Sequence, residues 1–381
     1  MLLFAALFLA LITFWLHRRL VRATGLPRPW SVAADLLLVV LWGLAVVGVA
    51  TGRILDPQWF RIPATVGLTW LAVVLYLVLG LAIVGLGSLV VRLMRRIRGH
   101  PADAEATRRH RDVLRVATAV VVIGALAASA YGVVEAARPQ VVQQRVELER
   151  LPDGFDGVRI ALVSDLHIGP VRSAAFTRRV VDTVNAQRPD LVLFAGDLTD
   201  GTVQNIGTEL APLADLRAPL GVYGVSGNHE FYADDGGAWL DQWERFGIRT
   251  LRNERVTLER GGAAIDLAGV HDYTAPEPYE ANLPVALNGR DARHFVLLLA
   301  HEPRQAFQAS DLGVDMLMSG HTHAGQIWPL RYLVPLQQPT VEGRDRIGAT
   351  TVYTTHGAGA WGPPVRVAAA PEVSILELRR A

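Results

Sequence analysis

Four long apolar stretches fill the first 135 residues of this 381-residue chain, and they constrain its fold more than any other feature. They cover residues 1–16, 31–50, 62–91 and about 113–134. A helix rises 1.5 Å per residue, so about 20 apolar residues cross the roughly 30 Å hydrocarbon core of a bilayer. We therefore expect residues 1–135 to form a transmembrane region of about four helices.

The first stretch is the shortest and has two interpretations. His17, Arg18 and Arg19 follow it, and such side chains can extend to the membrane interface and complete a span. A cleaved signal peptide is the alternative. No basic residue precedes the apolar stretch, however, and no small-residue cleavage site follows it cleanly. A spanning helix therefore fits the sequence better.

Arginine is distributed unevenly over the connections between the apolar stretches. The connections after the first and the third stretch are rich in Arg, whereas the second carries only Arg53 and Arg61, with Asp56 opposing them. Basic loops remain in the cytoplasm, so the Arg-rich connections should lie there. We expect a multi-pass protein of a bacterial cell membrane, with the region after the fourth span outside the cytoplasm.

The composition narrows the possible functions. The net charge of +1 provides no overall basic field for nucleic acid, so we expect no nucleic-acid partner. The chain has no Cys, which removes disulfides, thiolate metal ligands and Cys nucleophiles. Any metal site must therefore use His, Asp, Glu or Asn.

After a linker expected over residues 136–144, the pattern changes to short apolar runs that alternate with amphipathic stretches. This alternation predicts a mixed α/β domain over residues 145–381. The predicted strands cover residues 158–163, 191–195, 222–225, 264–270, 295–300, 316–318, 351–354 and 373–378. The main predicted helices cover residues 174–187, 206–216 and 237–246.

Polar, metal-type side chains follow five of these strands. In three cases a glycine precedes them and allows a sharp turn. Carboxyl ends of strands are where sites assemble in α/β sheets, so the five segments can converge on one point. Pairs two residues apart can point to the same side in extended chain. The segments are Asp165-Leu166-His167, Gly196-Asp197, Gly227-Asn228-His229, His301 and Gly320-His321-Thr322-His323.

Each segment alone has an ordinary structural explanation. A single Asp-x-His is more often a capped loop than a metal site, and Asn-His after a glycine is usually a turn. Here, however, the five segments end five apolar runs of one domain and hold five of the 11 His residues of the chain. Their combination indicates a metal site.

Together, in this order, the five segments resemble the signatures of the calcineurin-like metallophosphoesterases. The flanking residues 324–326 and 357–362 are similar to a bacterial, membrane-associated branch of that superfamily. The resemblance covers residues 145–381. It implies a four-layer domain in which two mixed β-sheets pack face to face with helices outside.

The resemblance also implies two divalent metal ions, which can be Mn, Fe or Zn. His229 matches the family's non-ligand histidine beside the substrate phosphate, and we expect it to act as a general acid. Where this branch commonly has Arg, the chain has His356. The implied ligands are Asp165, His167 and His323 for the first ion, Asn228, His301 and His321 for the second, and Asp197 as the bridge.

Several nearby residues have smaller predicted roles. Asp200 can orient a ligand from behind. His271 and Asp272 can either line the substrate entrance or fix a loop. The Pro-containing segment over residues 274–288 is too long for a tight turn, so a lid or specificity loop is one interpretation of it.

These observations predict a membrane-anchored, binuclear phosphoesterase. Two ions about 3.5 to 4 Å apart acidify a water and clamp the phosphate oxygens, so that a metal-bound hydroxide attacks a phosphoester or phosphodiester. The substrate is then a phosphorylated small molecule or lipid, and the short linker to the membrane favours a lipid. One alternative is a UDP-diacylglucosamine-type pyrophosphate hydrolase facing the cytoplasm, which the predicted orientation disfavours. The other is a non-catalytic metal-binding scaffold, although all seven ligand positions are filled.

Overall fold

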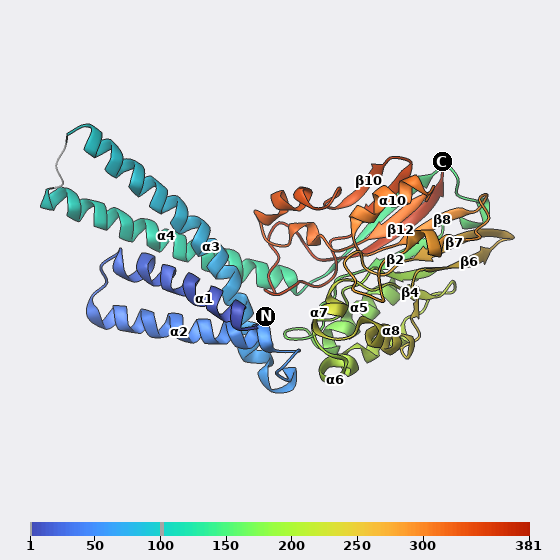
Figure 1. The fold of residues 1–381 in the computed structure, drawn as a ribbon, viewed down its shortest axis with the longest axis horizontal. Helices are drawn as coiled ribbons and strands as arrows, with labels where there is room; N and C mark the ends of the chain where they lie inside the picture. Colours follow the sequence, from blue (N-terminus) through green and yellow to red (C-terminus); the bar gives the residue numbers. More distant parts are fainter. Residues whose placement is uncertain (1, 100–102) are drawn as a thin grey trace.

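The computed structural model describes residues 2–99 and 103–381, so Met1, where the first apolar stretch begins, lies outside the described residues. Figure 1 shows two parts, an elongated bundle of long helices and an α/β domain beyond one end of it. The start of α1 and the α/β domain lie at the same end of the bundle (Figure 1).

Four candidate membrane-spanning helices form the bundle, as the apolar stretches predict. Each is long and apolar enough to cross a bilayer. The first continues beyond the predicted end of its stretch as a π-helical segment, η1 (His17–Arg22), which brings it to 21 residues. The helices are α1 (Leu2–Leu16), α2 (Arg28–Ala50), α3 (Pro57–Ile97) and α4 (Ala104–Ala136).

Small residues allow the helices of the bundle to approach closely. A Cβ atom added at Gly67 of α3 would lie 1.9 Å from the carbonyl oxygen of Leu44 of α2, and one at Gly48 of α2 would lie 2.8 Å from Leu68 Cγ. Bundles in lipid depend on such close packing, because burial of apolar surface does not drive their association. Leu, Phe, Val and Ile side chains cover much of the outer surface of the bundle, which suits contact with lipid.

Two six-stranded mixed sheets form the framework of the α/β domain. The first has the order β1-β12-β2-β3-β4-β5, and β2 to β5 run parallel. The second has the order β10-β11-β9-β8-β7-β6, and β11, β9, β8 and β7 run parallel. The first sheet contains β1 (Gln140–Leu148), β12 (Glu372–Arg380), β2 (Arg159–Val163), β3 (Leu191–Phe194), β4 (Val222–Gly224) and β5 (Arg249–Thr250). The second contains β10 (Gly343–Ile347), β11 (Thr350–Thr354), β9 (Met316–Ser319), β8 (Phe295–Leu299), β7 (Ala263–Gly269) and β6 (Glu254–Arg260).

The two sheets pack face to face, and helices cover their outer faces, so the expected four-layer architecture is confirmed. Side chains such as Leu162 and Leu193 of the first sheet meet Leu297 and Met318 of the second in one central core. On the outside of the first sheet lie α5 (Ala174–Ala186), η3 (Gly207–Asp215) and α8 (Gly236–Glu244). On the outside of the second lie α9 (Leu283–Ala286) and α10 (Ala306–Asp311).

Besides the strands β1, β5, β6 and β10, which were not predicted, the structure departs from the predicted elements in two places. Residues 206–216 were predicted as a helix, but η3 is a 3₁₀-helix that contains Pro212, whose ring nitrogen cannot donate to an α-helical carbonyl. Within the predicted linker, α4 ends at Ala136 and β1 already begins at Gln140. Only three residues therefore separate the last bundle helix from the first sheet.

The bundle docks on the α/β domain through specific contacts. The guanidinium of Arg61 donates to Gly169 O at 3.0 Å and to Glu209 Oε1 at 2.8 Å. Ala72 of α3 is buried in an apolar cluster with Ile327 and Val365 of the α/β domain. Polar and apolar contacts together hold the domain on the end of α3.

Candidate metal centre

All eight residues predicted at the site come together at the carboxyl ends of parallel strands. Asp165 and His167 follow β2, Asp197 follows β3, and Asn228 follows β4 and is succeeded by His229 at the start of α7 (His229–Ala233). The remaining ligands are His301 after β8 of the second sheet and His321 and His323 after β9. The edges of both sheets therefore supply the site.

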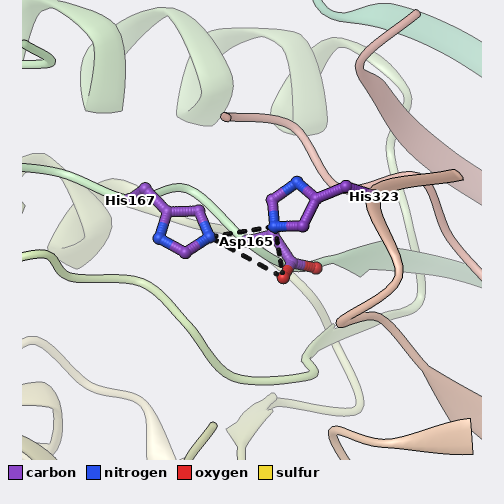
Figure 2. Close-up of side chains that lie close together, drawn as sticks. All are labelled: Asp165, His167 and His323. Carbon is purple, nitrogen blue, oxygen red and sulfur yellow. Dashed lines mark hydrogen bonds and ion pairs between the residues drawn. The ribbon is translucent and has the colours of Figure 1, made fainter. Parts of the chain in front are cut away.

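The first group consists of Asp165, His167 and His323, whose side chains point toward one another in Figure 2. His323 Nε2 lies 3.2 Å from Asp165 Oδ1 and 3.1 Å from His167 Nε2. All three residues are buried. Two imidazole nitrogens and a carboxylate oxygen thus converge within the reach of a single cation.

The second group lies around His301 and shares Asp197 with the first. His301 Nε2 is 3.1 Å from Asn228 Oδ1, 3.2 Å from His321 Nδ1 and 3.2 Å from Asp197 Oδ2. The same Asp197 Oδ2 lies 3.9 Å from His167 Nε2 of the first group. Asp197 therefore stands between the two groups.

The backbone of the ligand segments is left-handed rather than extended, which corrects the prediction for the two-residue pairs. Asp165, His167, Asp197, His321 and His323 have φ between 48° and 71°. Asp and His tolerate this region better than most residues, and such conformations gather at functional sites. One consequence is that His321 and His323 enter different groups instead of facing one side.

The glycines before the ligands act in two ways. Gly196 has a φ of 87° and makes the expected sharp turn before Asp197. Gly320 instead provides space, because a Cβ there would lie 2.1 Å from Ser164 Oγ and 2.4 Å from Asp165 Oδ2. Only glycine at this position lets the two loops approach each other.

Hydrogen bonds at the back of the imidazoles direct their other nitrogens inward. His301 Nδ1 donates to Ala195 O at 2.6 Å, so Nε2 presents its lone pair to the second group. His167 Nδ1 lies 3.0 Å from Asp200 Oδ1, so its Nε2 faces the first group. Asp200 thus has the orienting position that its place in the sequence predicted.

The charge state of the buried groups suits cation binding. Burial lowers the pKa of His321 to about 3 and that of His323 to about 4, so both are neutral at pH 7 and can act as ligands. Burial opposes a charge on His301 too, but the carboxylate of Asp197 raises its pKa well above the ordinary value. A cation would take the place of the proton that this carboxylate otherwise attracts.

One buried atom tests directly whether the residues fit a metal ion. Asp165 Oδ1 is buried and has no hydrogen-bond partner among the residues that the structure describes. Its neighbours are two imidazole nitrogens, His323 Nε2 at 3.2 Å and His167 Nε2 at 3.9 Å. A buried carboxylate oxygen without a donor is costly, and a cation would satisfy it. The donor set therefore fits divalent metal ions.

His229 lies beside these groups and is held by carboxylates. Its Nδ1 is 2.5 Å from Asp200 Oδ1, and its backbone N–H donates to Asp197 Oδ1 at 2.8 Å. Burial lowers the pKa of His229, but the carboxylates of Asp197 and Asp200 outweigh burial and raise it to about 9. With Nδ1 engaged by Asp200, Nε2 is the nitrogen left for a substrate.

Arg366 is a neighbour of the site that the sequence reasoning missed. It is fully buried, and its guanidinium donates to His323 O at 2.8 Å, to His356 O at 2.8 Å and to Gly359 O at 2.6 Å. It therefore fixes the backbone of a predicted ligand. The sequence feature that could have indicated this role is the position of Arg366 inside the otherwise apolar run that follows Gly362. His356, which stands where the resembling branch commonly has Arg, contacts Glu342, and its Nε2 lies 3.0 Å from Glu342 Oε2.

A cavity of about 530 Å³ opens in front of the metal-type ligands. Its lining includes Asp197, His229 and His321, and also part of η6 (Leu330–Leu336) and part of α3. A larger cavity of about 690 Å³ between α3 and α4 contains none of the predicted ligands. The cavity beside the ligands is therefore the one at which chemistry can occur.

The segment over residues 274–288, interpreted from sequence as a possible lid, contributes no residue to this lining within the described part of the chain. Leu283 of this segment, the first residue of α9, is buried in the core instead. His271 and Asp272 fix loops, since Ser226 Oγ lies 3.3 Å from His271 Nδ1 and accepts the Asp272 N–H at 3.2 Å. Residues of η6 line the cavity instead of this segment.

Comparison of the sequence with known proteins identifies the family of the chain. The sequence pattern of calcineurin-like phosphoesterases matches residues 158–325. The chain is 33% identical over 338 residues to a Danio rerio transmembrane protein with metallophosphoesterase domain, covering 86% of this chain and 75% of that protein. It is 31% identical over 274 residues to an uncharacterized metallophosphoesterase of Bacillus subtilis, covering 67% of this chain and 94% of that protein. Among solved structures, a phosphopantetheinyl hydrolase of Mycobacterium tuberculosis is similar with a TM-score of 0.36 and 14% identity, covering 55% of this chain and 91% of that one. The sequence matches show that the chain belongs to the calcineurin-like phosphoesterases, a family of metal-dependent phosphoester hydrolases.

Proposed function

We propose that the protein is a membrane-anchored phosphoesterase that holds two divalent cations and hydrolyses a phosphoester or phosphodiester. The observation that carries this proposal is the pair of buried ligand groups that share Asp197. Asp165, His167 and His323 would hold one cation, and the group around His301 would hold the other. When bound, the two cations would acidify the attacking water and neutralise charge on the phosphate oxygens.

The chain's own residues supply the remaining steps of the reaction. Asp197 would keep the two cations at a fixed separation, because its Oδ2 faces both groups. His229 would donate a proton from Nε2 to the leaving oxygen, while Asp200 keeps Nδ1 in place. The buried ligands hold their positions before substrate arrives, which is the geometric preorganisation that catalysis requires.

The connection to the membrane supports a lipid-linked substrate and an extracytoplasmic site. With three residues between α4 and β1, the site stays close to the bilayer surface. The start of α1 and the α/β domain lie at the same end of the bundle, as four spans require (Figure 1). The Arg-rich connections lie at the opposite end of the bundle, and by the positive-inside rule they would be cytoplasmic. We therefore infer that the protein lies in a bacterial cell membrane with its α/β domain outside the cytoplasm.

A substrate panel with the full-length protein in detergent tests the proposal. The protein is stripped with a chelator, reloaded with Mn, Fe or Zn, and assayed on lipid phosphates, nucleotide diesters and a chromogenic diester while its metal content is measured. We expect two ions per chain and hydrolysis of at least one class. His229→Ala should keep both ions and lower the rate by about two to four orders of magnitude. Fewer than two ions in the active wild-type protein would overturn the binuclear assignment.

A further inference from the structure

The cavity in front of the ligands has both polar and apolar lining residues. Its polar lining, which we call the polar end, includes His229 and four of the predicted metal ligands, Asp197, Asn228, His321 and His323. Side chains from two different parts of the chain line the apolar end, which we call the tail slot. The tail slot consists of Leu71 and Leu75 of α3 and of Leu330, Leu333 and Val334 of η6.

The bundle forms one wall of the tail slot. Leu71 and Leu75 are one helical turn apart, so they share a face of α3. Ala72, between them in sequence, is buried against Ile327 and Val365, which fixes this turn of α3 on the α/β domain. The wall of the cavity therefore continues into a helix that is long and apolar enough to cross a bilayer.

The second wall, η6, is mostly apolar although it is exposed, and its one charged residue, Arg331, pairs with Glu342. Leu333 is 57% exposed, Tyr332 68% and Leu336 79%, and all seven residues of η6 keep at least partial exposure. Trp328 and Trp361 flank this segment and are about half exposed. Such a group on one surface marks an interaction site, and aromatic side chains favour the membrane interface. The partner that fits this exposed apolar group is the bilayer beside α3.

Two buried amides along the same wall, those of Gln326 and Gln338, make hydrogen bonds within the protein. The side-chain amide of Gln326 donates to Trp361 O at 2.8 Å and accepts the Trp361 N–H at 2.8 Å. Gln338 Nε2 donates to Glu302 Oε2 at 2.6 Å. These amides are therefore engaged, and the wall suits a hydrocarbon chain better than a polar group.

We propose that the substrate is a lipid phosphoester that binds with its phosphate at the metal-type ligands and its hydrocarbon tail in the tail slot. The lipid enters sideways from the leaflet next to the α/β domain, between α3 and η6. This inference rests on the proposed function and adds to it a subsite and a substrate class. A volume of about 530 Å³ is within the range of cavities that enclose small ligands, so a head group and part of a tail fit.

A series of p-nitrophenyl alkyl phosphates from methyl to hexyl tests the tail slot on the full-length, metal-loaded protein. All members share one leaving group and stay monomeric, so only the tail changes. A methylene that moves from water into an apolar slot should raise kcat/KM about threefold to fourfold. We expect this rise along the series in the wild-type protein and a much flatter series in Leu333→Gln.

Leu336→Gln is the matched control. It makes the same change on the same short helix at a residue that is more exposed and does not line the cavity. We expect it to keep the wild-type dependence on tail length. A flat wild-type series, or equal flattening in both variants, would contradict the tail slot.

A binding measurement separates this inference from the proposed function. Dodecyl phosphate with a diazirine near the end of its tail is photolysed on the full-length protein, and the labelled peptides are identified by mass spectrometry. Labelling of α3 near Leu75 and of η6, reduced in Leu333→Gln, supports the tail slot even if no phosphoester is hydrolysed. Labelling scattered over the outer surface of the bundle refutes it, even if the protein hydrolyses every member of the series.

Discussion

Replacing Asp200 by Asn should shift the pH dependence of catalysis, because one oxygen of Asp200 contacts two imidazoles. Asp200 Oδ1 lies 2.5 Å from His229 Nδ1 and 3.0 Å from His167 Nδ1. Together with Asp197 it overcomes the effect of burial and raises the pKa of His229 to about 9. The Asn side chain keeps the size of Asp and an oxygen that accepts a hydrogen bond, but it removes the negative charge.

The size and direction of the shift follow from this geometry. An opposite charge in direct contact changes a pKa by about one to three units, so the pKa of His229 should fall by at least about one unit. A general acid works only while protonated, so activity is lost as pH rises through its pKa. Bound cations lower the pKa in both proteins, and the difference between them is therefore the informative quantity. The alkaline limb of the kcat profile should move to lower pH by about one to two units.

The assay follows hydrolysis of a chromogenic diester by full-length protein at saturating metal, with metal content measured at each pH. Asp241→Asn serves as the matched control, because that carboxylate is 61% exposed and pairs with Arg252 away from His229. In the control, the alkaline limb of the kcat profile should lie at the same pH as in the wild-type protein. If the limb of Asp200→Asn stays in place or moves to higher pH, Asp200 does not set the protonation of the acid.

Four further changes test other parts of the structure. Asp197→Asn should lower the metal content below two ions and abolish turnover, because Oδ2 faces both ligand groups; two retained ions measured by mass spectrometry would argue against the bridge. Glu230→Ala should destabilise the metal-free fold by at least about 3 kcal/mol in unfolding experiments, because it leaves three buried backbone N–H groups without an acceptor. The raised pKa of His229 stabilises the metal-free fold fully below pH 6.5, and this stabilisation is lost as pH rises through about 9. The melting temperature should therefore fall over that interval, and less so in His229→Gln. Ala381→Cys should react with an impermeant maleimide in intact cells and Arg98→Cys only after lysis; the reverse pattern would place the site in the cytoplasm.

The features that could be predicted are those that the local sequence encodes. The four apolar helices follow from apolar stretches that are long enough, or nearly long enough, to span a bilayer. The eight predicted strands are present, and most of them are short, apolar, buried runs. Those that were missed are β1, β5, β6 and β10, which are the edge strands of the two sheets and carry many charged or polar residues. A strand at an edge needs little apolar surface, so its sequence resembles a loop.

The pairing of residues was decided only by the tertiary structure. His167 and His323 are 156 positions apart in sequence, and the 3.1 Å between their Nε2 atoms depends on how the two sheets stack. Arg366 likewise contacts His323 although it lies in a segment after the last ligand. Leu75 and Leu333 line one cavity although Leu75 belongs to the bundle and Leu333 to η6. Local sequence determines which side chains are available at the end of a strand. Burial of the two sheet faces against each other, and of the α/β domain against α3, determines which of them meet.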